Sequence, residues 1–137
     1  MGKVFEHLDD RLRAWLLAQP MFVVATAPSQ GGHVNASPKG MAGTFVVRGP
    51  TTVGYLDYTG SGAETIAHLQ DNGRITLMLN AFSGPPRVVR LQGRVVLLDD
   101  PEFAELRPAF SKQREIGQRA IVVVELTGLR TPAAPCR

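Results

Sequence analysis

The sequence has little cysteine: Cys136, close to the C-terminus, is the only one in 137 residues. A single cysteine excludes an intramolecular disulfide framework and argues against a cysteine-rich zinc site. A reducing environment is the simplest setting for such a chain, so we expect a cytoplasmic protein. No apolar run approaches the roughly 20 residues of a membrane helix. The charged N-terminus is unlike a signal peptide, so we expect neither a membrane anchor nor a leader.

Concentrated charge and clusters of catalytic residue types are also missing. The 15 basic residues are dispersed among 12 acidic ones, for a net charge of +3. This balance allows weak attraction of anionic ligands but does not indicate nucleic-acid binding. His7, His33 and His68 are far apart and lack metal-ligand spacing, so we expect no metal site. No Ser-His-Asp or Cys-His arrangement indicates hydrolysis.

What is present is typical of one soluble globular domain. Hydrophobic residues make up 44% of the chain and charged residues 20%. A chain of this length buries a hydrophobic core without the help of disulfides or a structural metal. We expect a single domain over residues 1–130. Residues 131–137, TPAAPCR, are rich in proline and are expected to form a loose tail.

Hydrophobic periodicity predicts few helices and many strands. Apolar residues three and four positions apart predict an amphipathic helix over residues 4–19, which Pro20 stops. Shorter helices are predicted at 65–71 and 100–110. Short runs rich in β-branched and aromatic residues predict strands, with residues 38–40 as the irregular end of the second. These strands cover residues 21–27, 33–37, 44–48, 52–57, 74–82, 87–99 and 120–126.

Six or seven strands punctuated by glycine and proline favour a mainly β fold, a closed or nearly closed antiparallel barrel with a few short helices. A parallel α/β sheet would need a helix after nearly every strand, and the chain lacks them.

Residues 51–69, TTVGYLDYTGSGAETIAHL, read as a strand, a glycine turn and the start of a helix. The first N–H groups of a helix lack internal partners and attract anions, so this stretch suggests a ligand that carries a phosphate. The alternative is purely structural: Gly60 and Gly62 form a tight turn, and Ser61 or Thr65 caps the helix. Asp57, at the end of the strand, is either a structural residue or a proton-transfer group, and the structural role is favoured.

Four blocks carry a family resemblance: VNASPKG at 34–40, YLDYTGSGAETIAHL at 55–69, NGRITLMLNAF at 72–82 and GPPRVVRLQGRV at 84–95. Their order and spacing resemble the pyridoxamine 5′-phosphate oxidase-like family of FMN-binding split barrels. The resemblance implies a six-stranded antiparallel split barrel, usually a homodimer, with FMN in a groove at the dimer interface.

Carried onto this chain, the resemblance implies three cofactor-binding segments. Lys39 would lie near the flavin phosphate, and Ser37 would add a hydroxyl donor. Alternate residues of a strand face opposite ways, so Arg87 and Arg90 cannot share one pocket unless the strand bulges. We favour Arg87 for the cofactor and leave Arg90 as a candidate for an interface. The implied residues are Asn35, Ala36, Ser37, Pro38 and Lys39; Tyr58, Thr59, Gly60 and Ser61, with Thr65 one helical turn further; and Arg87 with Val88.

The chain departs from the oxidase proper in two places. Where that enzyme has adjacent basic residues for the phosphate, this sequence reads Ala63-Glu64-Thr65. It also ends soon after its last strand, where the oxidase continues into a segment with basic residues for its substrate. The first departure makes binding of the flavin phosphate depend more on Lys39, on an arginine and on the helix N-terminus. The second argues against pyridoxamine phosphate as the substrate.

We therefore expect a flavoprotein oxidoreductase in which FMN exchanges hydride or electrons with an unidentified small molecule. No catalytic residue is assigned. The alternatives are a deazaflavin-dependent reductase of the same fold, a flavin- or haem-binding sensing module without turnover, and a structural domain with a degenerate pocket. We expect neither nucleic acid nor a membrane as a partner.

Overall fold

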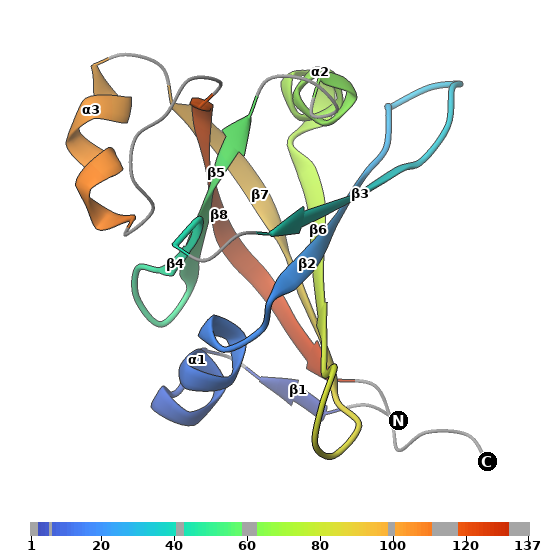
Figure 1. The fold of residues 1–137 in the computed structure, drawn as a ribbon. Helices are drawn as coiled ribbons and strands as arrows, with labels where there is room; N and C mark the ends of the chain where they lie inside the picture. The colour runs from blue at the N-terminus through green and yellow to red at the C-terminus, as the bar shows by residue number, and fades with distance from the viewer. Residues whose placement is uncertain are drawn as a thin grey trace.

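The computed structural model describes residues 3–5, 7–40, 43–58, 63–98, 101–110 and 118–131. Within them, one antiparallel sheet of eight strands curls into a split barrel, in the order β3-β2-β6-β7-β8-β5-β4, with β1 paired to β8 (Figure 1). The predicted mainly β, split-barrel fold is confirmed. The strands are β1 (Lys3–Phe5), β2 (Met21–Thr26), β3 (Asn35–Gly40), β4 (Phe45–Val47), β5 (Thr52–Tyr58), β6 (Arg74–Asn80), β7 (Val88–Leu98) and β8 (Gln118–Thr131).

The strand count exceeds the six that the family resemblance implied. Two of the additional elements, β1 and β4, are only three residues long. Both lie outside the long central strands that hold the sheet together, so they extend the barrel without changing its architecture.

The core lies inside the curl of the sheet. Val24, Leu77 and Leu91 are register partners on β2, β6 and β7, and all three side chains are fully buried. Cross-strand partners point to the same face of a sheet, so one buried row spans three strands. Alternate residues of these strands face outward and are half-buried or exposed.

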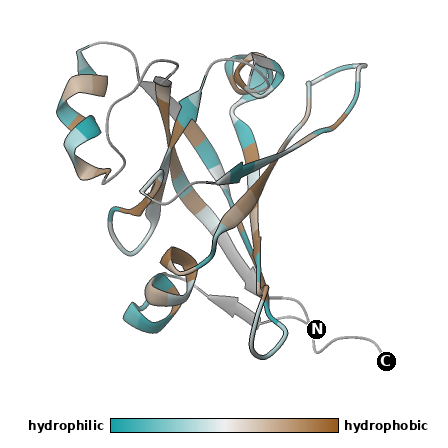
Figure 2. Cartoon of the chain, viewed as in Figure 1, coloured by the Kyte–Doolittle hydropathy of each residue, from teal (hydrophilic) through white to brown (hydrophobic). Residues whose placement is uncertain are grey.

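Three helices cover the barrel. Helix α1 (Asp10–Leu17) lies at one end and α2 (Ala63–Asn72) over the other (Figure 1). The amphipathic character of α1 is visible in Figure 2, and its Leu12 and Leu16 join the main core. Helix α3 (Glu102–Leu106) and the following 3-10 turn (Arg107–Ala109) bury Phe103 and Phe110 against β5 and β8 in a second, outer cluster. No helix in the described part of the chain is long and apolar enough to cross a membrane.

The predicted helix over residues 4–19 is wrong at its start. Residues 3–5 are strand β1, paired with β8 from Lys3 opposite Thr131 to Phe5 opposite Leu129. The helix begins only after Asp9, whose side chain accepts the N–H of Leu12 at 2.8 Å. This side-chain cap satisfies an N–H group that otherwise has no partner, and so fixes where the helix starts.

The second strand also differs from its prediction. It starts at Asn35 rather than at residue 33, and it continues through Pro38 to Gly40 instead of becoming irregular. Strand β3 is at the edge of the sheet, where a proline does not remove a ladder hydrogen bond from a second neighbour.

The last strand is longer than the predicted 120–126. Strand β8 pairs with β5 at one end and with β7 and β1 at the other, and these partners extend it to residues 118–131. Thr131, expected in the loose tail, is therefore paired. The rest of that tail, with Cys136, lies outside the described residues.

Candidate functional site

A row of polar side chains lies on the inner face of β3. Asn35, Ser37 and Lys39 alternate along the strand, and Ser37 is buried while the other two are half-buried. Their register partners on β2 are all buried on the inner face of the barrel, so the three polar side chains also point inward. Those partners are Thr26, Val24 and Phe22 respectively.

The ammonium of Lys39 faces a buried carboxylate. Its Nζ lies 3.8 Å from Oδ1 of Asp57, and the two side chains are 14% and 0% exposed. Strands β3 and β5 are not neighbours in the sheet. The curl brings them together, and Thr44 links them: its hydroxyl donates to the carbonyl of Gly40, and its own carbonyl accepts the N–H of Leu56. The ion pair thus spans the open side of the barrel.

The hydroxyl of Ser37 is buried, at 6% exposure, and has no hydrogen-bond partner among the described residues. A buried polar group without a partner costs free energy, which a ligand that supplies the missing partner would recover. Ser37 and Lys39 are two positions apart on one face, so a hydroxyl donor and an ammonium are presented together.

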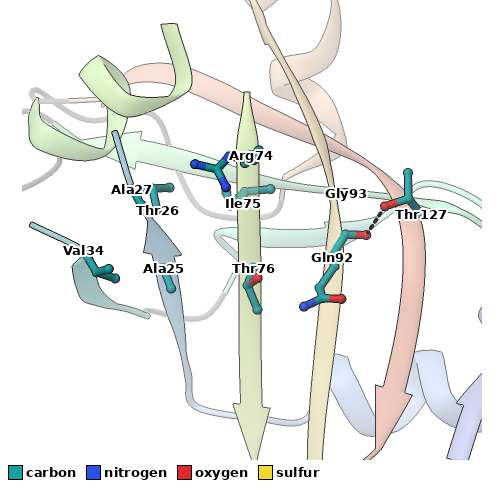
Figure 3. Close-up of a pocket in the computed structure, with 10 residues that line it drawn as sticks. All are labelled: Ala25, Thr26, Ala27, Val34, Arg74, Ile75, Thr76, Gln92, Gly93 and Thr127. Carbon is teal, nitrogen blue, oxygen red and sulfur yellow. Dashed lines mark hydrogen bonds between the residues drawn. The ribbon is translucent and has the colours of Figure 1, made fainter. Parts of the chain in front are cut away.

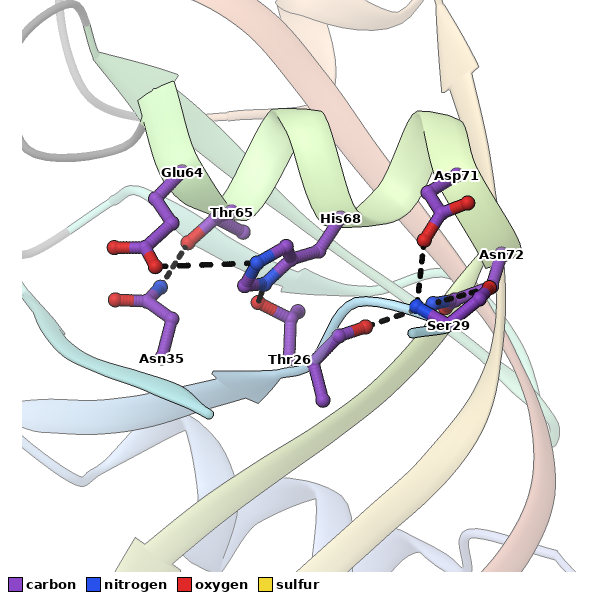
Figure 4. Close-up of polar contacts among 9 residues, drawn as sticks. Thr26, Ser29, Asn35, Glu64, Thr65, His68, Asp71 and Asn72 are labelled. Carbon is purple, nitrogen blue, oxygen red and sulfur yellow. Dashed lines mark hydrogen bonds and ion pairs between the residues drawn. The ribbon is translucent and has the colours of Figure 1, made fainter. Parts of the chain in front are cut away.

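Helix α2 is fastened to this row near its start. The side-chain amide of Asn35 donates to the hydroxyl of Thr65 at 2.8 Å (Figure 4). Thr26 Oγ1 lies 3.0 Å from Nδ1 of His68, whose Nε2 is 3.9 Å from a carboxylate oxygen of Glu64. Asn35 and Thr65 are therefore partnered to each other, and they set the position of the helix over β3.

The other end of α2 is fastened to the turn after β2. The N–H of Ser29 donates to the carboxylate of Asp71 at 2.6 Å, and the side-chain amide of Asn72 donates to the carbonyl of Ala27 at 2.7 Å (Figure 4). Hydrogen bonds from the backbone and hydroxyl of Ser29 hold the pKa of Asp71 below its ordinary value. Both ends of α2 are thus held at fixed places over the barrel mouth.

Comparison with known proteins identifies the family. The protein-family model described as pyridoxamine 5′-phosphate oxidase matches residues 8–131. This chain belongs to the pyridoxamine 5′-phosphate oxidase family. A curated member, the pyridoxamine 5′-phosphate oxidase family protein ustO of Aspergillus flavus, is 42% identical over 125 residues. The match covers 89% of this chain and 50% of the relative, so the chain spans about half the length of ustO.

Solved structures share the family's fold at low sequence identity. An FMN-binding protein from Syntrophomonas wolfei is similar with a TM-score of 0.70 and 12% identity, covering 92% of this chain and 85% of its own. The FAD binding protein from Mycobacterium smegmatis gives a TM-score of 0.59 and 18% identity, covering 93% and 97%. These similarities establish the fold.

Of the first segment that the resemblance implied for the cofactor, residues 35–39, only alternate residues lie in the row, and the described part of the second implied segment lies outside it. Ala36 and Pro38 are exposed, so they face away from Ser37 and Lys39 on β3. Tyr58, half-buried at the end of β5, packs against the outer cluster under α3. Thr59, Gly60 and Ser61 lie outside the described residues.

The third segment that the resemblance implied, at Arg87 and Val88, lies elsewhere. The guanidinium carbon of Arg87 is 5.0 Å from the ring centre of Trp15 on α1. Val89 is fully buried in the main core, so Val88 and Arg90 face outward on β7. No described contact links this segment to Lys39. The polar row and the Arg87 segment are therefore separate parts of one chain.

A hollow on the outer face of the sheet was not predicted. It has a volume of about 370 Å³ and crosses β2, β6, β7 and β8, with Ala25, Thr76 and Gln92 among its lining residues and Arg74 also contributing (Figure 3). The register shifts between Gln92 and Gly93 at this point. Sequence reasoning missed the hollow because a bulge of this kind leaves only an isolated glycine as its signal.

Proposed function

We propose that this chain is an FMN-binding flavoprotein that acts as an oxidoreductase on a small molecule. The observation that carries the proposal is the inner row of β3. In it the Ser37 hydroxyl, which has no hydrogen-bond partner among the described residues, and the Lys39 ammonium lie two residues apart. Relatives of the same fold that bind FMN and FAD support a flavin as the ligand.

The residues present suit the phosphate end of FMN. The hydroxyl of Ser37 would donate one hydrogen bond to a phosphate oxygen, and the ammonium of Lys39 would add charge. Helix α2 begins at Ala63 over the same end of the barrel, and the N-terminal end of a helix carries a positive partial charge. Asn35 and Thr65 would act indirectly, because their mutual hydrogen bond places that helix end.

A bound flavin supplies the hydride or electron transfer, and the protein supplies its position and surroundings. In this chain, the half-buried inner row would exclude water from one end of the ligand, and the clamped helix α2 would fix the direction of approach. Among the described residues, Asp57 is the carboxylate facing Lys39, and the structural role that the sequence favours for it over proton transfer stays a prediction.

A homodimer is part of the proposal. The family resemblance assigns both the β3 row and the Arg87-Val88 segment to one cofactor, yet the structure separates them within the chain. A second copy would bring the outward-facing Val88 to the flavin held by the first. The outer face of β2, β6 and β7, which carries the hollow, supports this arrangement, because α3 covers β5 and β8 instead.

A flavin-binding module without turnover is the second candidate. It is favoured by the ion pair of Lys39 with Asp57, which commits the one ionisable group of the row to a carboxylate on β5. Turnover with a nicotinamide electron donor distinguishes the two functions.

The first test is the visible absorption spectrum of the purified protein, followed by titration of the stripped protein with FMN while flavin fluorescence is recorded. The proposal expects the bands of an oxidised flavin and saturable binding. A colourless protein that ignores FMN contradicts it, and the deazaflavin cofactor would then be titrated in the same way.

A further inference from the structure

Lys39 already has an ion-pair partner within the chain, the carboxylate of Asp57. The Asp57 side chain is completely buried, and its Oδ1 lies 3.8 Å from the Lys39 ammonium. The pair carries no net charge, so a phosphate entering beside Ser37 meets a cation that is already compensated.

We propose that Asp57 is a specificity-determining residue of this site. Its carboxylate competes with the phosphate of a ligand for the ammonium of Lys39, and so sets how strongly the site prefers ligands that carry a phosphate. The inference rests on the proposed function, since it concerns the phosphate end of the same site. Asp57 acts through Lys39 and is therefore a positioning residue.

The two partners differ in their freedom to move. Asp57 lies on β5, which pairs with β8 through most of its length, and its backbone partner is Ala120. Its short side chain cannot follow a ligand. Lys39 lies on the edge strand β3 and has a flexible stem of four carbons. The lysine is thus the partner that can turn toward a phosphate, while the carboxylate stays behind.

This difference imposes a cost on phosphate binding. When Lys39 turns away, the ion pair between its ammonium and the buried carboxylate of Asp57 is broken, and breaking a buried ion pair is unfavourable. The cost is subtracted from the attraction between Lys39 and the phosphate. A ligand without a phosphate leaves the ion pair intact and does not incur the cost.

Glu64 is not an equivalent competitor. Its side chain is 57% exposed and lies near His68, four residues along α2. Solvent screens an exposed carboxylate, so its influence on Lys39 is weak compared with that of Asp57.

The test compares FMN with riboflavin, which lacks only the phosphate. The affinity ratio of the two ligands isolates the phosphate contribution, because both share the ring system. Asp57→Asn keeps the shape and removes the charge. We expect it to raise the FMN-to-riboflavin ratio roughly ten- to hundredfold, the range for a hydrogen bond to a charged group. Glu105→Gln, which removes an exposed carboxylate on α3, is the matched control and should leave the ratio unchanged.

A double-mutant cycle identifies the route of the effect. Adding Lys39→Met to Asp57→Asn should abolish the increase, because the released cation is then missing. An unchanged ratio in Asp57→Asn overturns the proposal. An increase that persists in the variant without Lys39 also overturns the proposal, since the carboxylate of Asp57 would then repel the phosphate directly and not act through Lys39.

Asp57→Asn leaves Lys39 half-buried and uncompensated, so the variant can be too unstable to titrate. In that case the proposal expects inorganic phosphate to raise its unfolding temperature more than that of the parent protein, compared with chloride at equal ionic strength. If phosphate raises the unfolding temperatures of the variant and the parent equally, the proposed role of Asp57 is overturned. Failure of the proposed function is a separate outcome, in which the parent protein binds neither FMN nor riboflavin. The unfolding temperatures in inorganic phosphate still test the role of Asp57 in that case.

Discussion

Gly93 shows how a single residue controls the path of β7. The register between β7 and β8 shifts beside it, and a Cβ atom at this position would overlap the carbonyl oxygen of Glu125. Gly93→Ala forces the strands apart, so we expect a loss of about 1–3 kcal/mol in the free energy of unfolding. Urea denaturation measures it. Gly49→Ala is the control, because no atom lies within 4 Å of its added Cβ, and it should stay within about 0.5 kcal/mol of the parent. Equal effects of the two substitutions would contradict the argument.

Asp71 links folding to pH. The Ser29 hydrogen bonds lower its pKa in the folded protein, so the carboxylate stabilises the fold above its unfolded-state pKa of about 3.9. That stabilisation is lost as the pH falls through the lower folded-state pKa. Asp71→Asn should therefore lose less stability than the parent between about pH 5 and pH 3. Urea midpoints across this range provide the measurement, with Glu105→Gln as the control for removing a carboxylate. Identical acid profiles for Asp71→Asn and the parent would refute the linkage.

At the level of residues, part of the candidate site follows from the sequence. The period of two in a strand is enough to place Asn35, Ser37 and Lys39 on one face once β3 is recognised. The partner of Lys39 is harder to predict from the sequence. Asp57 lies on a strand that is not adjacent to β3, and no local pattern states which strands the curl of a sheet will bring together.

Among the elements, the start of α1 depends on one side chain. Asp9 accepts the N–H of Leu12 at 2.8 Å, and loss of such a cap costs about 1 kcal/mol. We expect Asp9→Ala to lower the free energy of unfolding by that amount, and Asp9→Asn, which retains an accepting oxygen, to remain near the parent. Thermal or urea unfolding of the three proteins tests this. If the alanine and asparagine variants lose stability equally, the charge rather than the cap is responsible.

The boundaries of elements were harder to predict than their existence. Apolar spacing located α1 but extended it backward over residues 3–5, because β-pairing with β8 depends on residues more than 120 positions away. Pro38 suggested an irregular end, whereas the edge position of β3 tolerates it. Both errors have the same cause: the deciding partner is distant in sequence, and short-range patterns cannot contain it.

For the whole molecule, the sequence could not show that the segments implied for the cofactor occupy two places. Lys39 faces the interior beside Asp57, while Arg87 stacks on Trp15 of α1. Their separation is a property of the folded split barrel, because it depends on which face of which strand each residue occupies. This separation makes the number of chains in the assembly a functional question.

The proposed homodimer can be tested on the outer face of the sheet. Met78 lies between Val23 and Arg90 in register on β2, β6 and β7, and its side chain is half-buried on the outward side. If a second copy covers this face, Met78→Glu buries a carboxylate beside Arg90, and the desolvation of a buried ion pair often costs more than its attraction returns. Light scattering should then show the parent at twice the 14.8 kDa chain mass and the variant near the single mass.

The same variant connects assembly to the cofactor. If the partner's outer face completes the flavin site, Met78→Glu should weaken FMN binding although it lies on the face opposite to Lys39. Gln70→Glu places the same charge on an exposed position of α2 and should alter neither mass nor affinity. A monomeric parent that binds FMN fully would refute the shared site. A dimer that survives Met78→Glu would show that the chains meet through a different face, since burying a carboxylate at the centre of this one is unfavourable even beside Arg90.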